Sequence, residues 1–147
     1  MSEHKATIHW QRKTEDFNYK TYDRTHDVTF SGGTLIQASA APEYMGNKAL
    51  ANPEELMVAA LSSCHMLTFL AMAALKNLVV DNYIDDAVGV LGKNAEGKMA
   101  LTQVTLRPKI TFSGTQPDAQ TLHQLHEKAH SNCFIANSVT TKVDVEG

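Results

Sequence analysis

The 147-residue chain has few cysteines and no concentration of charge of either sign. It contains only two cysteines and one tryptophan, and its 13 Lys and Arg residues are interspersed with 16 Asp and Glu residues, for a formal net charge of −3. Because the basic residues form no cluster, we do not expect a nucleic-acid partner or binding to anionic membranes. Two cysteines are also too few for a scaffold held together by several disulfides.

The first ten residues, MSEHKATIHW, lack the apolar segment of a secretory signal peptide. We therefore expect a cytoplasmic, reducing location. In that setting two cysteines are more often buried thiols, metal ligands or a redox pair than a permanent crosslink. The length and the apolar content of 43% predict a single globular domain over residues 1–147, with no internal repeat.

Residues 52–75, NPEELMVAALSSCHMLTFLAMAAL, predict one long helix with Cys64 near its middle. Asn52 is a good N-cap, and Pro53 suits the first helical position, where its missing N–H costs nothing. Glu54 and the glutamate after it place negative charge at the positive end of the helix dipole. The rest of the stretch has no charged side chain and is rich in Leu, Met and Ala, so a helix of about six or seven turns is expected.

An uncharged run of this length could also span a bilayer. Four polar side chains dilute it, however, and no loop rich in Lys and Arg sets an orientation, so we expect a buried core helix and no membrane contact. A helix that is apolar on most faces needs covering from most sides, and a short chain has little material for this. We therefore expect a dimer in which the partner completes the covering.

The remaining pattern predicts strands grouped around two helices, which is an α+β fold. Alternating apolar residues predict an N-terminal antiparallel meander with strands at about 6–10, 28–30 and from 35 onward, and a turn at 31–33. A loop at 38–51 leads into the long helix. Two further strands, 83–92 and 99–113, are expected to form a hairpin through 93–97, with Pro108 at an edge or a bulge. A helix at 117–131 and a strand at 139–145 complete the prediction.

Three sequence features together carry a resemblance of the chain to one known family. They are the segment Asn52-Pro53-Glu54-Glu55-Leu56, the cysteine Cys64 ten positions after Glu54, and the segment Lys128-Ala129-His130-Ser131-Asn132-Cys133. The chain resembles the OsmC/Ohr proteins, osmotically induced protein C and the organic hydroperoxide resistance proteins, and SSCHMLTFLA is similar to the OsmC-like branch. The resemblance implies an OsmC-like fold, with antiparallel sheets around a long buried central helix, in an intertwined homodimer with two active sites at the interface.

The same resemblance implies a thiol-dependent peroxidase that reduces organic hydroperoxides and, in some members, hydrogen peroxide. Carried over by position, Cys64 would be the peroxidatic cysteine and Cys133 the resolving one. A thiolate attacks the peroxide bond to give a sulfenic acid, which a second thiol converts into a disulfide. An external dithiol, in the family often a lipoylated protein or another small thiol, then reduces the disulfide, and neither a metal nor an organic cofactor is needed.

The family activates its thiolate with an arginine that a glutamate holds. Glu54 matches this glutamate, and we favour Arg24 as the arginine because it lies between the first two strands, as the Ohr arginine does. Two features depart from the family: residues 38–51 lack the arginine of OsmC proper, and Phe134 stands where Pro commonly follows the resolving cysteine. Ten residues of straight helix separate Glu54 from Cys64 by about 15 Å. We therefore expect Glu54 and Arg24 to reach the Cys64 of the partner subunit.

Two alternatives from other classes stay open. The first is a metal site formed by His126, His130 and Cys133, which follow at i, i+4 and i+7, with Cys64 as a fourth ligand. The second is a non-catalytic member of the fold that binds apolar ligands or partners.

Two further side-chain placements follow from the helix itself. His65 is turned about 100° from Cys64 around the helix, so we expect a buried or interface histidine and not a catalytic base. If the protein is a peroxidase, Leu67 and Phe69 are expected to line an apolar substrate site.

Overall fold

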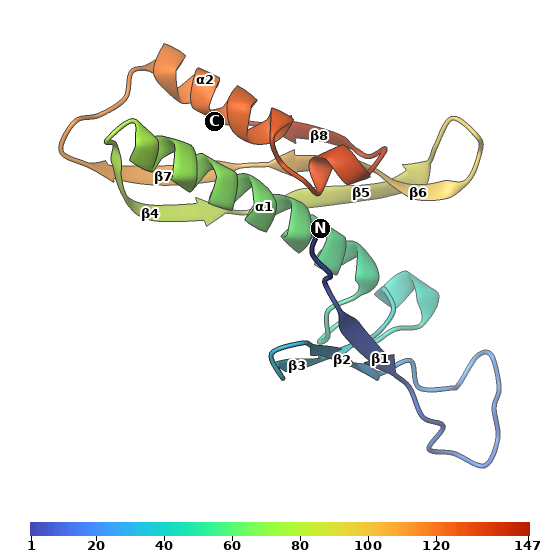
Figure 1. Ribbon diagram of the computed structural model, residues 1–147. Helices are drawn as coiled ribbons and strands as arrows, with labels where there is room; N and C mark the ends of the chain where they lie inside the picture. Colours follow the sequence, from blue (N-terminus) through green and yellow to red (C-terminus); the bar gives the residue numbers. More distant parts are fainter. The chain divides into compact units, whose positions relative to one another are not determined.

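The computed structural model describes residues 1–147 and divides into two compact units, Met1–Leu56 and Met57–Gly147 (Figure 1). Each unit has its own strand pairing and its own contacts. The prediction of a single domain over residues 1–147 stays a prediction, because the division into units does not test it.

The first unit contains the predicted antiparallel meander. Strands β1 (Ala6–His9), β2 (His26–Phe30) and β3 (Leu35–Ala38) form a three-stranded sheet in the order β1-β2-β3. The turn between β2 and β3 places Gly33 at φ 94°, in the left-handed region that favours glycine, and its N–H donates to the carbonyl of Phe30 at 2.9 Å. The following loop contains a short 3₁₀ helix, η1 (Pro42–Tyr44), and leads to the long helix.

The long helix α1 spans Pro53–Leu75 and confirms the predicted start and end. The Asn52 side chain caps it, because its Oδ1 accepts a hydrogen bond from the backbone N–H of Glu55 at 2.9 Å. The helix stops where Asn77 adopts a left-handed conformation with φ 59°, and the N–H of Leu78 then donates back to the carbonyl of Ala73 at 2.9 Å.

The two long strands predicted after α1 are each broken into two, so that part of the prediction was wrong. The four strands are β4 (Val79–Asp85), β5 (Val88–Lys93), β6 (Met99–Leu106) and β7 (Pro108–Ser113). The pair β4–β7 forms one sheet and the pair β5–β6 belongs to another. At the break, one oxygen of the Asp85 carboxylate accepts from the N–H of Arg107 at 2.6 Å, and the other accepts from the Ser62 hydroxyl on α1.

The C-terminal elements also follow the predicted order. Helix α2 (Ala119–Ser131) starts behind Asp118, whose side chain accepts from the N–H of Thr121 at 2.7 Å. A short 3₁₀ helix, η2 (Ala136–Ser138), separates it from β8 (Lys142–Val145), which begins three residues later than predicted. Strand β8 pairs with β6 in parallel, so the expectation of purely antiparallel sheets was wrong, whereas the α+β class is confirmed.

Helices α1 and α2 run along the sheets of the second unit (Figure 1). Two clusters of buried side chains hold them there. In one cluster, Phe69 and Leu125 from the two helices pack with apolar residues of β4 and β7. In the other, Leu61 packs with Val104 and with residues of β6 and β8. Gly89 permits the close approach of α1 to β5, because a Cβ at that position would lie 2.5 Å from the Val58 side chain.

Only one stripe of α1 is buried within the chain. Its members are spaced four residues apart and are Leu61, His65, Phe69 and Ala73. Leu67, on another face of the helix, is 61% exposed, so a single chain leaves part of the apolar surface of α1 uncovered, as the sequence led us to expect. By length and composition alone, α1 is the one helix that is long and apolar enough to cross a membrane, and 22% of its most apolar 18-residue window is buried.

Candidate active site

The structure brings the two cysteines together. Cys64 is half-buried on α1, and Cys133 is 1% exposed, two residues beyond the end of α2. Both thiols are free, and they lie close enough for Cys64 to affect the pKa of Cys133. Because Cys133 lies 69 positions after Cys64, only the packing of α2 on α1 creates this contact.

The surroundings of Cys133 keep it protonated. Burial raises the pKa of the Cys133 thiol most, and the neighbouring Cys64 side chain raises that pKa further. The N–H of Ala136 donates to its Sγ at 3.4 Å and opposes the rise. Since the thiolate is the reactive form, a buried thiol of raised pKa is a poor first nucleophile. Cys64, which is half-buried, is also the more accessible of the two sulfurs.

His65, which follows Cys64, points into the core as expected and meets a histidine of α2. The Nε2 atom of His65 lies 3.0 Å from the Nδ1 atom of His126, and the two rings are stacked, with centroids 5.3 Å apart. Burial, and secondarily the repulsion from His126 and His130, lowers the pKa of His65 to about 4. Burial also lowers the pKa of His126. Both rings are therefore neutral at neutral pH.

The metal-site alternative was wrong. Helix α2 ends at Ser131, so Cys133 does not continue the helical face of His126 and His130. No group of three or more His, Cys, Asp or Glu side chains lies in an arrangement that could hold a metal ion.

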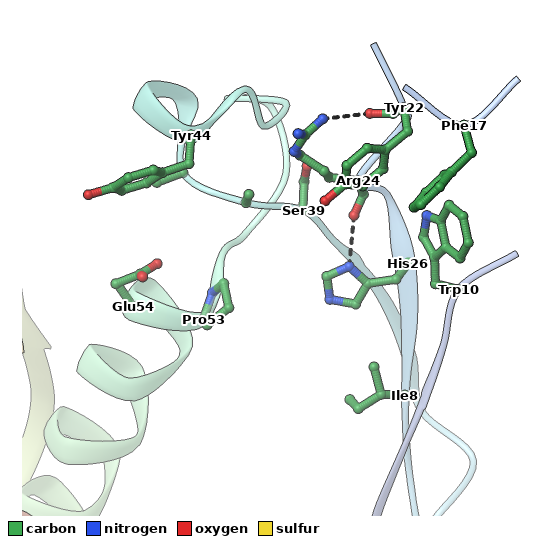
Figure 2. Close-up of a pocket in the computed structure, with 12 residues that line it drawn as sticks. Ile8, Trp10, Phe17, Tyr22, Arg24, His26, Ser39, Tyr44, Pro53 and Glu54 are labelled. Atoms are coloured by element: carbon green, nitrogen blue, oxygen red, sulfur yellow. Dashed lines mark hydrogen bonds between the residues drawn. The ribbon is translucent and has the colours of Figure 1, made fainter. Parts of the chain in front are cut away.

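The first unit contains a cavity of about 590 Å³ with aromatic walls (Figure 2). Trp10, Phe17 and Tyr22 line it and form one aromatic cluster, in which ring centroids lie 5.0 to 6.1 Å apart. The Trp10 indole N–H donates to the carbonyl of Asp23 at 2.7 Å, which fixes that ring in place. Such a cavity is suited to an apolar group of a ligand.

Arg24 and Glu54 both line this cavity, but they do not pair with each other in one chain. Figure 2 shows Arg24 beside Tyr22, with Glu54 on a separate wall. The Arg24 guanidinium donates to the carbonyls of Tyr22 at 2.7 Å and Tyr19 at 2.6 Å, and it lies 3.8 Å from the centroid of the Tyr22 ring. The Oε2 atom of Glu54 is buried without a hydrogen-bond partner. The ion pair implied by the family resemblance is thus not formed within this chain.

One of the two residues expected to line a substrate site lies elsewhere. Phe69 is 0% exposed and packs in the core against His126, Tyr83 and Phe112, so it lines no open surface of the chain. Leu67 is exposed and remains available.

Two features of the site were missed by sequence reasoning. The aromatic walls could have been found from the concentration of aromatic residues around Arg24, namely Trp10, Phe17, Tyr19 and Tyr22. The Ser62–Asp85 hydrogen bond, which ties α1 to the end of β4 two residues before Cys64, had no sequence signal, because the partners are 23 positions apart.

Fold and site together define an α+β protein in which a long uncharged helix carries one thiol and a segment behind a second helix supplies another. A model of the OsmC-like protein family matches residues 46–146. The chain belongs to the OsmC family.

Several known proteins are similar to this chain. An OsmC-like protein of unknown function from Vibrio cholerae is 51% identical to the chain, with a TM-score of 0.96 and coverage of 99% of both chains. An organic hydroperoxide resistance protein OsmC from Legionella pneumophila, 20% identical, shares the fold with a TM-score of 0.73 over 99% of this chain and 95% of that chain. The uncharacterized protein YmaD of Bacillus subtilis is 25% identical over 121 residues, 80% of each sequence.

Proposed function

We propose that this protein is a cysteine-based peroxidase that reduces organic hydroperoxides in the reducing cytoplasm. The observation that carries the proposal is that Cys64 and Cys133, both free thiols, are neighbours in the fold, close enough for Cys64 to raise the pKa of Cys133. Two free thiols that are neighbours in the fold are candidates for a disulfide that forms and breaks during a catalytic cycle. The names of relatives such as the Legionella hydroperoxide resistance protein support the same reaction class.

The proposed cycle has three balanced steps. The Cys64 thiolate attacks the terminal oxygen of ROOH, the O–O bond breaks, and the leaving alkoxide takes a proton to give ROH and a Cys64 sulfenic acid. The Cys133 thiol then attacks the Cys64 sulfur, which forms the disulfide and releases water. An external dithiol, such as a lipoylated protein, reduces the disulfide and is itself oxidised. The two thiols supply both electrons, so the cycle requires no metal or organic cofactor.

The unequal burial of the two thiols supports their assigned roles. A peroxide must reach the first nucleophile, and Cys64 is half-buried whereas Cys133 is 1% exposed. The raised pKa of Cys133 leaves little of it as thiolate, so it is poorly suited to begin the cycle. Its position beside Cys64 supports the role of resolving thiol.

We further propose that the active site is completed by a second copy of the chain. Glu54 and Cys64 lie ten residues apart on one continuous helix, about 15 Å along its axis. In one chain Arg24 is bound to backbone carbonyls and Glu54 lacks a partner. In the proposed homodimer, Arg24 would activate the partner's Cys64 and Glu54 would hold the arginine. The partner would also cover the exposed apolar face of α1.

In such a dimer, the aromatic cavity beside Arg24 would receive the organic part of the peroxide. Trp10, Phe17 and Tyr22 supply apolar walls, and each buried CH₂ of a substrate contributes roughly 0.8 kcal/mol to binding. This assignment replaces Phe69, which lies in the core.

The proposal is tested by peroxide consumption with dithiothreitol or dihydrolipoamide as the reductant. We expect Cys64→Ser to abolish turnover, because the serine hydroxyl cannot form a sulfenic acid. We expect Cys133→Ser to complete one rapid reaction with peroxide and then to stall or to over-oxidise, visible as a mass increase of two or three oxygens at Cys64. Wild-type turnover by Cys64→Ser would overturn the peroxidase assignment.

A second candidate, a non-catalytic binder of apolar ligands, is favoured by the aromatic cavity alone. Its volume of about 590 Å³ lies in the range of small-molecule sites. Binding of a non-peroxidic alkyl or aryl ligand at this cavity, lost in Trp10→Ala and unchanged in Cys64→Ser, together with no peroxide consumption by the wild type, would favour this candidate.

A further inference from the structure

The two buried histidines join the two elements that carry the thiols. His65 directly follows Cys64 on α1, and His126 lies on α2, which leads into the segment of Cys133. Their ring nitrogens are 3.0 Å apart, and the His126 ring also packs on Phe69 with centroids 4.6 Å apart. The pair thus forms the polar part of an otherwise apolar interface between the two helices, in which Phe69, Ala73, Leu125 and Ala129 are fully buried.

The position of Cys133 depends directly on that of α2. The N–H of Cys133 donates to the carbonyl of His130 at 3.3 Å, and the N–H of Asn132 donates to that of Lys128 at 3.1 Å. These bonds attach the cysteine segment to the last turn of the helix. A motion that separates the end of α2 from α1 while these bonds are kept also withdraws Cys133 from Cys64.

The hydrogen bonding of the pair offers no acceptor for the N–H that an additional proton would create. One ring donates its N–H to the nitrogen of the other, and the two remaining nitrogens, His65 Nδ1 and His126 Nε2, are buried without partners. Protonation of either ring would add a second buried donor with no acceptor and would place a charge among apolar side chains. Both effects favour exposure of the ring to water.

The charged and titratable groups around the pair do not offset this penalty. Helix α1 presents no charged side chain from residue 56 to 75. Asp85 attracts a proton to His65, but burial and repulsion from His126 and His130 outweigh it and lower the pKa of His65 to about 4. The other groups near the pair are Tyr83 on β4, His123 and Glu127 on α2, Asp144 on β8 and the backbone of Gly147.

We propose that the His65–His126 pair is an acid-sensitive latch: it holds α2 on α1 while both rings are neutral, and its protonation releases the end of α2 together with Cys133. The approach of Cys133 to Cys64 thus depends on pH through two histidines that take no part in the thiol chemistry. For a ring whose pKa is 6.5 in the open state and about 4 in the closed state, the opening constant at pH 6 is about four times its value at high pH. At pH 5 it is about thirty times that value.

The test is the accessibility of Cys133 in the Cys64→Ser protein, which contains a single thiol. Since Cys133 is 1% exposed, 4,4′-dithiodipyridine can reach it only after local opening. Its labelling rate, divided by the rate of a short peptide containing Cys133 at the same pH, gives the opening constant. We expect this constant to rise about thirtyfold from pH 7.5 to pH 5.

Two variants and one spectroscopic measurement complete the design. With His65→Leu and His126→Leu combined, the opening constant should change less than twofold over this pH range, whereas His9→Gln, an exposed histidine on β1, should behave as the parent. Should the double variant fail to fold, NMR titration of the ring protons in the parent decides: a midpoint near 4 for His65, with the pKa of His126 also below the ordinary histidine value, supports the latch. A flat opening constant in the parent, retained pH dependence in the double variant, or midpoints near 6.5 would overturn it. No peroxide is used, so the outcome is independent of the proposed peroxidase activity.

Discussion

Replacing Phe69 with alanine should cost about 3–5 kcal/mol of the free energy of unfolding. Phe69 is 0% exposed, and its ring centroid lies 4.6 Å from that of His126, 5.8 Å from that of Tyr83 and 6.5 Å from that of Phe112. A buried phenylalanine removes roughly 150–200 Å² of apolar surface from water, and at about 25 cal/mol per Å² this corresponds to about 4–5 kcal/mol. Measured truncations of buried aromatic residues span a similar range, because the cavity left behind collapses only partly.

The assay is urea unfolding followed by far-UV circular dichroism at 222 nm, which reports on α1 and α2. With a slope of about 2 kcal/mol per M, the midpoint should fall by about 1.5–2.5 M. Phe134→Ala is the matched control, because Phe134 is 81% exposed and its truncation should change stability by less than about 0.5 kcal/mol. A loss below about 1 kcal/mol for Phe69→Ala, or an equal loss for both variants, would refute the placement of Phe69 between the helices and the β4–β7 sheet.

Three further outcomes are expected. Alkyl and aryl hydroperoxides should exceed hydrogen peroxide in kcat/KM, and Trp10→Ala should reduce that preference; a clear preference for hydrogen peroxide would contradict an apolar binding wall. Mixed dimers of Arg24→Ala and Cys64→Ser chains should recover part of the peroxidase activity, since each contains one intact composite site; inactivity of verified mixed dimers would remove the shared site. Because the pKa of His65 is lowered to about 4 on folding, its contribution is present above pH 6.5 and is lost as the pH falls toward 4, which predicts a loss of about 2 kcal/mol at pH 5 relative to pH 7.5. Urea midpoints at the two pH values check this, and an equal loss in the protein with both histidines replaced by leucine would contradict it.

The N-terminal meander, the start of α1 and the turn of the β5–β6 hairpin could be predicted because local chemistry decides them. Asn52 and Pro53 define the helix start through a side-chain cap and a missing N–H, whatever the rest of the chain does. The strand breaks at Asp86–Ala87 and at Arg107 could not be predicted. They depend on the Asp85 carboxylate, which binds a backbone N–H and a serine hydroxyl that are both more than twenty positions away.

The candidate site shows the same division. The sequence by itself determined that Cys64 lies on a long uncharged helix and that Cys133 follows a second helix, because composition and capping are local properties. It could not determine which face of α1 is buried, since a helix that is apolar on most sides has no preferred face of its own. Tertiary packing chose the stripe that contains His65 and Phe69, and this choice paired His65 with His126, brought the two thiols into contact and left Leu67 exposed.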